Sequence, residues 1–246
     1  MAVAEDHSDP DVSSAFADAW IFAERIPGWL THDQARCLWD AAQGLGPGSM
    51  AVEIGSHQGR STVALAKGAQ RAGSTVVAID PFLDGAVFGG QRTRKRFEQH
   101  VREAEVTDVV RLEPDYSQRV LSTWSDMVHL LYIDGKHDFW SCTRDIGWVA
   151  HMPPGASVFI HDAFSSVGVT ASLIREQSRR RPRLRYRSRV GSLALFTVGQ
   201  PSGSERLALV GELGWFSRNL MVKVLLRLRL RSAARLLGHD SPYDPY

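Results

Sequence analysis

The feature that most constrains the fold is a run of short apolar segments that alternate with helical segments from Met50 onward. The apolar segments are rich in β-branched residues and show no polar alternation, which indicates strands buried on both faces. Helical segments between them predict parallel connections. We therefore predict an α/β fold with a doubly wound, Rossmann-like sheet. The five segments read MAVEIG, TVVAID, VVRLEP, VHLLYID and SVFIHD.

Two further strand-like runs follow in the segment RLRYRSRVGSLALFTVG, joined at Gly191. No helix fits between them, so the seven-stranded sheet is expected to end in a C-terminal antiparallel hairpin. Arginines alternate along the first run, and cations on an outer strand discourage edge-to-edge pairing. The same run could suggest RNA binding, but it contains only one aromatic residue, Tyr186. We expect no nucleic-acid partner.

Length and composition predict one sizeable core with appendages. The chain has 246 residues, of which 43% are hydrophobic, and an α/β unit of this size is commonly one domain. We divide it into residues 1–48, an N-terminal tail and helical cap, residues 49–200, the α/β domain, and residues 201–246, an amphipathic basic helical tail. Residues 1 to about 14 are expected to be a loose tail, and Thr31 is the expected N-cap of the next helix.

Charge and cysteine content exclude several classes of protein. The formal net charge is only +2, so the whole chain favours neither a nucleic acid nor an acidic partner. Cys37 and Cys142 are the only cysteines and lack metal-type spacing, which predicts a reducing compartment. The N-terminus has neither the basic start nor the apolar run of a signal peptide. These features predict a cytoplasmic protein.

The first strand leads into a glycine turn, VEIGSHQGRST. In an open parallel sheet, ligands bind beyond the carboxyl ends of the strands. Glycines let a ligand approach the backbone, and a following helix N-terminus offers free N–H groups. An acid at the end of the second strand, Asp80, can accept both hydroxyls of a ribose. A tight packing turn is the alternative. The residues of the turn considered for cofactor binding are Glu53, Gly55, Ser56 and Gly59.

Acids and histidines gather at the ends of the fourth and fifth strands. The fourth ends in YIDGKH, with Asp134 and His137, and the fifth in FIHDAF, with His161 and Asp162. Neighbouring parallel strands lie about 4.8 Å apart, so carboxylates at matching ends could share a hard cation. A lone aspartate at a strand end is more often a helix cap. Four such residues together favour a site.

The succession VEIGSHQGRST, AID, IDGKHDFWSCTRDIGWV and PPGASVFIHD resembles the class I S-adenosylmethionine-dependent methyltransferases. Its Asp-Gly-x-His motif resembles that of the macrocin and mycinamicin sugar O-methyltransferases. The resemblance covers residues 50 to about 199. It implies S-adenosylmethionine as cofactor, with Asp80 at the ribose and Ser117 near the adenine. Glu53, Gly55, Ser56 and Gly59 would line the cofactor, and Asp134 would lie beside it.

By the same resemblance, His137 is the general base, Asp134 is catalytic, and a divalent cation such as Mg²⁺ could bind Asp134, His161 and Asp162. His161 stands where some metal-dependent members have a carboxylate, so metal dependence stays open. The expected reaction is O-methylation of a small molecule or a sugar. An NAD-dependent oxidoreductase and a non-catalytic binding module built on the same fold are the alternatives.

The tail ELGWFSRNLMVKVLLRLRLRSAARLLG predicts one amphipathic helix. A cation every four residues would form one stripe along it. Such a helix could lie on an anionic membrane at its inner face, or it could pack against the domain or a second subunit. The stripe consists of Lys223, Arg227, Arg231 and Arg235.

Overall fold

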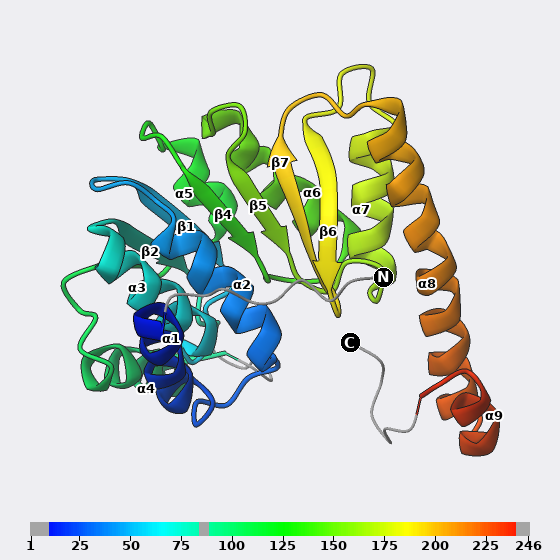
Figure 1. The fold of residues 1–246 in the computed structure, drawn as a ribbon, viewed down its shortest axis with the longest axis horizontal. Helices are drawn as coiled ribbons and strands as arrows, with labels where there is room; N and C mark the ends of the chain where they lie inside the picture. Colours follow the sequence, from blue (N-terminus) through cyan, green and yellow to red (C-terminus); the bar gives the residue numbers. More distant parts are fainter. Residues whose placement is uncertain (1–9, 84–88, 240–246) are drawn as a thin grey trace. The chain divides into compact units, whose positions relative to one another are not determined.

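The computed structural model of the protein describes residues 10–83 and 89–239 (Figure 1). The described strands form one seven-stranded sheet in the order β3-β2-β1-β4-β5-β7-β6. This order, with its antiparallel pair at one edge, confirms the predicted α/β fold and C-terminal hairpin. The chain divides into two compact units, residues 1–116 and 117–246, and each is described by itself.

The first unit is built from parallel strands and the helices that follow them. Met50 to Ile54 pair in register with Thr75 to Ile79, and nearly every side chain of these two strands is buried, as expected for strands covered on both faces. Its strands are β1 (Met50–Ile54), β2 (Thr75–Ile79) and β3 (Val110–Glu113). Its helices are α1 (Pro10–Ala23), α2 (His32–Gln43), α3 (Arg60–Ala72) and α4 (Gln91–Glu103).

The start of α1 corrects the expectation of a loose tail as far as residue 14. The helix begins at Pro10, where proline is well tolerated because its missing N–H has no helical partner. Phe16 is buried and its ring lies 5.6 Å from that of Trp39, which anchors the helix. The part of the predicted tail in residues 1–9 lies outside the described residues.

Helix α2 begins where the sequence predicted. Thr31 is its N-cap, and the Thr31 hydroxyl accepts a hydrogen bond from the Gln34 backbone N–H at 3.4 Å. The Gln34 side chain accepts in return from the Thr31 N–H at 3.0 Å. This reciprocal pair is a capping box, which satisfies two N–H groups that the first turn leaves free.

The second unit contains one parallel pair of strands and the antiparallel hairpin. β4 (Leu130–Ile133) pairs in parallel with β5 (Ser157–Ile160). β5 pairs antiparallel with β7 (Leu193–Val198), which turns back onto β6 (Leu184–Val190). The helices are α5 (Ser117–Ser122), α6 (Phe139–Asp145), the 3-10 helix η1 (Ile146–His151), α7 (Val167–Gln177), α8 (Gly203–Arg227) and α9 (Arg231–Leu236).

The alternating arginines of β6 hold helix α8. Arg185 and Arg187 both contact Glu205, at 2.9 Å and 3.0 Å. Arg189 contacts Glu212 at 2.6 Å. Its guanidinium also lies 4.0 Å from the ring centre of Trp215, within the range of a cation–π interaction. The arginine run therefore binds an element of the same chain.

The C-terminal segment is not the single helix that its periodicity predicted. α8 ends at Arg227, and α9 begins at Arg231. Between them Arg229 adopts a φ of 59°, which lies outside the right-handed helical region. The predicted stripe of four cations is thus divided between two helices. In residues 10–83 and 89–239, no helix is long and apolar enough to cross a membrane.

Close packing of α3 against α2 generates a prediction about Gly68. A Cβ built at Gly68 would lie 2.5 Å from the Trp39 carbonyl oxygen, so Gly68→Ala must push the two helices apart. We expect a loss of about 1–3 kcal/mol of unfolding free energy, typical of overpacking. Gly211 in α8 has open space at its Cβ position, so the control Gly211→Ala should stabilise by up to about 1 kcal/mol. Urea denaturation measures both, and equal effects would contradict the packing argument.

Candidate functional site

The glycine turn after β1 is locked to the start of α3 by a buried acid. Glu53 is fully buried, and its two carboxylate oxygens accept hydrogen bonds from the hydroxyls of Ser61 and Thr62. Gly55 and Gly59 both have a φ of 93°, a conformation that favours glycine. The acid predicted to line the cofactor therefore also fixes the shape of the turn.

Asp80 closes the same turn from the end of β2. Its carboxylate accepts hydrogen bonds from the backbone N–H groups of His57 and Phe82, both at 2.9 Å. These bonds fix the orientation of the carboxylate. Each oxygen has further acceptor capacity, so both contacts are compatible with the predicted role at a ribose.

Ser56 contributes a buried polar group to the same turn. Its hydroxyl is buried and has no hydrogen-bond partner among the described residues. A buried polar group without a partner is costly, and a ligand would supply the missing bond. Gly59, the N-cap of α3, gives no side-chain cap to the helix, whose first N–H groups can bind an electron-rich group. These features fit a bound cofactor.

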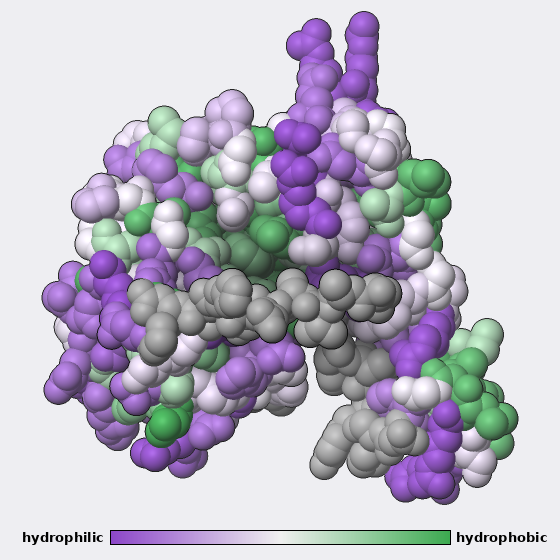
Figure 2. All heavy atoms as spheres, in the orientation of Figure 1, coloured by the Kyte–Doolittle hydropathy of each residue, from purple (hydrophilic) through white to green (hydrophobic). Residues whose placement is uncertain are grey.

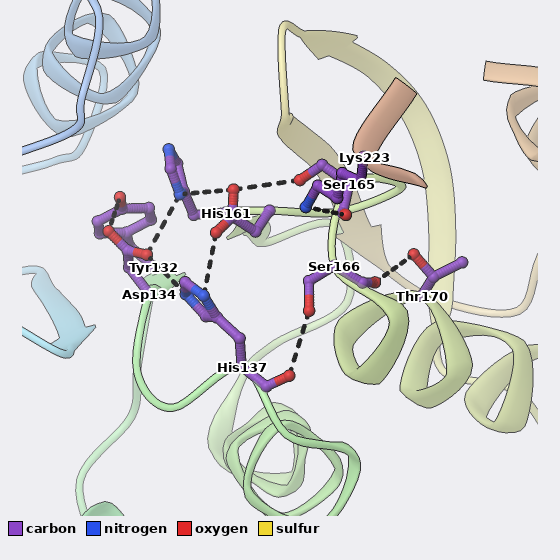
Figure 3. A network of polar contacts seen from close by, with 9 residues as sticks. Tyr132, Asp134, His137, His161, Ser165, Ser166, Thr170 and Lys223 are labelled. Atoms are coloured by element: carbon purple, nitrogen blue, oxygen red, sulfur yellow. Dashed lines mark hydrogen bonds and ion pairs between the residues drawn. The ribbon is translucent and has the colours of Figure 1, made fainter. Parts of the chain in front are cut away.

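In the second unit, the parallel pairing of β4 and β5 places the predicted acid and histidine groups side by side (Figure 3). Ile133 pairs with Ile160, so the next residues, Asp134 and His161, emerge at the same level. His161 Nδ1 lies 3.2 Å from Asp134 Oδ1. The Tyr132 hydroxyl donates to Asp134 Oδ2 at 2.9 Å.

His137 lies between two carboxylates. Its Nε2 is 3.3 Å from Asp134 Oδ1, and its Nδ1 is 3.0 Å from Asp162 Oδ2. The His137 side chain is 41% exposed, whereas that of Asp162 is 4% exposed. One ring nitrogen thus points to a buried acid and the other to a partly accessible one. The four predicted residues form one cluster, which we call the Asp–His cluster: Asp134, His137, His161 and Asp162.

Mutual charge interactions set the protonation of the cluster. Burial alone would lower the pKa of His161, but the charge and hydrogen bond of Asp134 raise that pKa to about 9. Burial would raise the pKa of Asp134, yet His161 and His137 hold it well below its usual range. Burial would also lower the pKa of His137, and the two aspartates raise it instead. His161 is therefore protonated at neutral pH, and the two aspartates favour the protonated form of His137.

The backbone at His137 is held from α7. The Ser166 hydroxyl donates to the His137 carbonyl oxygen at 3.2 Å (Figure 3). A Cβ built at Gly168 would lie 2.3 Å from the same oxygen, so only glycine allows this close approach. The position of the imidazole is thus fixed by the start of a neighbouring helix as well as by its own ion pairs.

The loop that carries Asp162 is held by α8. Asp162 and Phe164 have φ values of 53° and 58°, a region that non-glycine residues rarely adopt. The Asn219 side-chain amide donates to the Phe164 carbonyl at 3.2 Å, and Lys223 Nζ donates to the Ser165 carbonyl at 2.8 Å. Asn219 is fully buried. Both residues therefore position the loop that carries Asp162.

Ser117, predicted near the adenine, opens helix α5 and donates its hydroxyl proton to the buried Asp145. Burial, partly opposed by this hydrogen bond, raises the pKa of Asp145 to about 6. A hydroxyl that donates its one hydrogen bond to a carboxylate can only accept further hydrogen bonds. If Ser117 contacts a cofactor, its oxygen would therefore accept a hydrogen bond from the cofactor.

The donors proposed for a divalent cation are engaged with one another. The His161 imidazole pairs with the carboxylates of Asp134 and Asp162. These pairs favour the protonated form of His161, which has no lone pair for a metal at Nδ1. Within the part of the chain that the structure describes, no group of three or more His, Cys, Asp or Glu side chains is arranged to hold a metal ion. The arrangement does not fit a metal site, and the predicted cation stays a prediction.

Sequence reasoning found the members of the Asp–His cluster but missed their supports. Tyr132 lies inside an apolar strand, and Asn219 and Lys223 lie more than fifty residues from the loop that they hold. The one available signal was an asparagine within a helical run rich in apolar residues. Asp145, the partner of Ser117, could not be distinguished from an ordinary surface acid.

Comparison with protein families gives a match to part of the chain. A family model described as a methyltransferase domain, Methyltransf_24, covers most of the sheet from β1 to the end of β5. Residues 52–163 match a methyltransferase domain. The matched region begins in β1 and ends just after Asp162, so it contains the glycine turn, Asp80 and the whole Asp–His cluster.

Solved structures of methyltransferases share the fold. An O-methyltransferase from Bacillus cereus in complex with S-adenosylhomocysteine is 17% identical, with 80% of this chain and 94% of that chain covered and a TM-score of 0.55. TomG from Streptomyces achromogenes, an O-methyltransferase involved in tomaymycin synthesis and solved with S-adenosylmethionine, is 17% identical over 78% of this chain and 90% of its own, with a TM-score of 0.54.

The methyltransferase PaMTH1 from Podospora anserina, bound to S-adenosylhomocysteine, is 12% identical over 80% of this chain and 91% of its own, with a TM-score of 0.61. At these identities the likeness shows the fold. Together with the matched domain, it supports a class I S-adenosylmethionine-dependent methyltransferase. The macrocin-like subgroup stays a prediction.

The raised pKa of His161 predicts that stability depends on pH. An unfolded histidine titrates near 6.5, so the stabilisation is fully present below that pH and is lost as pH rises through the folded pKa of about 9. We expect the unfolding free energy to fall between these values by up to about 3 kcal/mol. His161→Asn should flatten this dependence and leave the contribution of His137, whose pKa is also raised.

Urea denaturation at several pH values measures this effect. The control is His32→Asn, which removes an exposed histidine that pairs with Asp33 in α2 and should leave the slope of the wild type unchanged. A slope in His161→Asn equal to that of the wild type would show that His161 is not the group that titrates.

Proposed function

We propose that the protein methylates a hydroxyl group of a small molecule or a sugar, with S-adenosylmethionine as methyl donor. The observation that carries this proposal is the imidazole of His137 held between Asp134 and Asp162, within a matched methyltransferase domain. O-methyl transfer requires removal of the hydroxyl proton, and histidine is the side chain best suited to accept it near neutral pH.

Cofactor binding is proposed for the glycine turn and the residues after it. The Ser56 hydroxyl, buried without a partner among the described residues, would gain its hydrogen bond from the cofactor. Asp80 would accept the ribose hydroxyls, and the N-terminus of α3 would face an electron-rich group. Ser117 is proposed as an acceptor near the adenine. A sulfonium methyl group is already activated, so the chain has to position the acceptor and remove a proton.

His137 can act as a base only after one of its contacts is exchanged. Both ring nitrogens now contact carboxylates, and a base needs a free lone pair. The contact of Nε2 with Asp134 is the longer and more accessible one, so we propose that the acceptor hydroxyl replaces Asp134 there. Asp162 then keeps Nδ1 protonated and fixes the ring orientation. Asp134 remains beside the His137 imidazolium that forms, and the negative charge of Asp134 stabilises this imidazolium.

The first test of the proposal is cofactor binding with Ser56→Ala. Removing a buried hydroxyl that has no protein partner should leave thermal stability unchanged or higher, whereas a lost hydrogen bond to the cofactor should weaken affinity by about two- to tenfold. Calorimetry with S-adenosylmethionine measures the affinity, expected in the micromolar range for the wild type. NAD titrated in parallel should give no heat.

The matched control is Ser74→Ala. The Ser74 hydroxyl is also buried, but it donates to the Ala69 carbonyl at 3.3 Å, so its loss should lower stability without changing cofactor affinity. Binding of NAD but not of S-adenosylmethionine by the wild type would favour the oxidoreductase alternative. If the wild type binds neither compound, the non-catalytic binding module would be the favoured alternative.

The second test is the pH dependence of methyl transfer. Because the pKa of His137 is raised, the free base forms only above the usual range of histidine, and kcat/KM should rise with pH beyond about 6.5. Asp134→Asn removes one of the charges that raise this pKa, so the rise should move to lower pH. His137→Ala should remove the rise and slow turnover by about 10²–10⁴-fold.

An acceptor must first be found by screening sugar and phenolic hydroxyl compounds for formation of S-adenosylhomocysteine. His32→Ala, which removes a histidine from the other exposed His–Asp pair, is the control and should retain the wild-type profile. Normal turnover by folded His137→Ala protein would exclude His137 as the base. A shift of the rise to higher pH in Asp134→Asn would contradict the charge argument.

A further inference from the structure

The outer face of α8 is an apolar stripe with no partner among the described residues. Exposed positions recur every three or four residues along the helix, so they share one side. Most are large apolar side chains: Leu207 is 72% exposed, Met221 55% and Leu228 63%. Two small residues continue the stripe between them. The full stripe is Leu207, Val210, Gly214, Ser217, Met221, Val224 and Leu228.

The opposite face of α8 is occupied by the rest of the second unit. Leu209, Asn219 and Val222 are buried. The acids of the helix, Glu205 and Glu212, pair with the arginines of β6. The negative charges of α8 are therefore neutralised on the inner side, and none belongs to the outer stripe.

The described segment beyond Glu212 has an excess of positive charge. Residues 213–239 contain six Lys or Arg residues and no Asp or Glu. Two of the six are used internally: Arg218 donates to the carbonyls of Leu237 and Gly238, and Lys223 binds the Ser165 carbonyl. The remaining four are exposed and make no ion pair with a described residue. These four are Arg227, Arg229, Arg231 and Arg235.

Apolar side chains are interspersed with these cations. Leu230 is 51% exposed and Leu236 is 89% exposed. Figure 2 shows the result as hydrophobic and hydrophilic surface side by side along the edge formed by α8 and α9. We call residues 203–239 the C-terminal arm.

We propose that the C-terminal arm binds the surface of a membrane that contains anionic lipids. An amphipathic helix lies in the interface with its apolar side chains among the acyl chains, and its cations bind the headgroups. In a symmetric contact between two arms, the exposed arginines of one copy would approach those of the other, and this repulsion opposes self-association through the surface. The inference is independent of the proposed reaction.

Vesicle flotation of the full-length protein tests the proposal. Vesicles of phosphatidylcholine alone are compared with vesicles of phosphatidylcholine and phosphatidylglycerol. We expect binding to the anionic vesicles, weak binding to the neutral ones, and release at high salt, because ionic strength screens exposed charges. Binding to both kinds of vesicle without salt dependence would overturn the role given to the cations.

Two sets of substitutions separate charge from apolar contact. Arg227→Gln with Arg231→Gln and Arg235→Gln should lower the partition coefficient about fivefold for each cation removed. Met221→Gln with Val224→Gln and Leu228→Gln should also lower it, by removing the inserted side chains. The control for charge is Arg175→Gln with Arg180→Gln and Arg181→Gln, three exposed arginines outside the arm, which should bind like the wild type.

The outcomes are distinct. Both arm variants should keep the wild-type melting temperature and cofactor affinity, so loss of vesicle binding cannot be attributed to unfolding. Failure of the wild type to bind anionic vesicles, or an equal loss in the control variant, overturns the proposal. Sedimentation equilibrium tests whether the stripe binds a second copy instead. That alternative predicts a wild-type protein that is a dimer and does not bind vesicles, and an apolar variant that is a monomer.

Discussion

The in-register parallel pairing of β4 with β5 determines the geometry of the Asp–His cluster. Ile133 lies opposite Ile160, and the His161 N–H continues the ladder by donating to the Ile133 carbonyl at 2.9 Å. Asp134 and His161 are therefore adjacent because of backbone hydrogen bonds, before any attraction between their side chains. A shift of one residue would turn one of them to the other face. Burying two charged side chains costs desolvation free energy. Backbone pairing thus brings Asp134 and His161 together in spite of this cost.

The two predicted groups of residues differ in how their acids are used. At the glycine turn, Glu53 and Asp80 bind hydroxyl and backbone N–H groups of their own unit, so they mainly preserve a shape. In the Asp–His cluster, each carboxylate faces an imidazole, so proton position can change without a change of fold. The proposed methyl transfer would need a rigid site for the cofactor and a base whose proton can be exchanged, and the two groups of residues match these two requirements.

The sequence was sufficient to predict the fold because the apolar runs are short, separated by helices and free of polar alternation. The strand ends could be located for the same reason, and with them the acids and histidines. Ion pairing between those residues could not be predicted, since it depends on side-chain distances of a few ångströms. The break at Arg229 was missed because the periodicity of the apolar residues continues through it, while a single φ angle ends the helix.

Helix α8 shows that an element outside the predicted α/β pattern can still stabilise a loop within it. The α/β pattern ends near Gly199, yet Asn219 and Lys223 donate to the carbonyls of Phe164 and Ser165. Backbone in sparsely populated regions costs on the order of 1–3 kcal/mol per residue, and these donors offset part of that cost for the loop of Asp162. A shortened protein that kept every strand would lose both donors, so its acid would sit on a differently shaped loop. Domains transplanted between such proteins should therefore be exchanged together with the helix that follows the last strand.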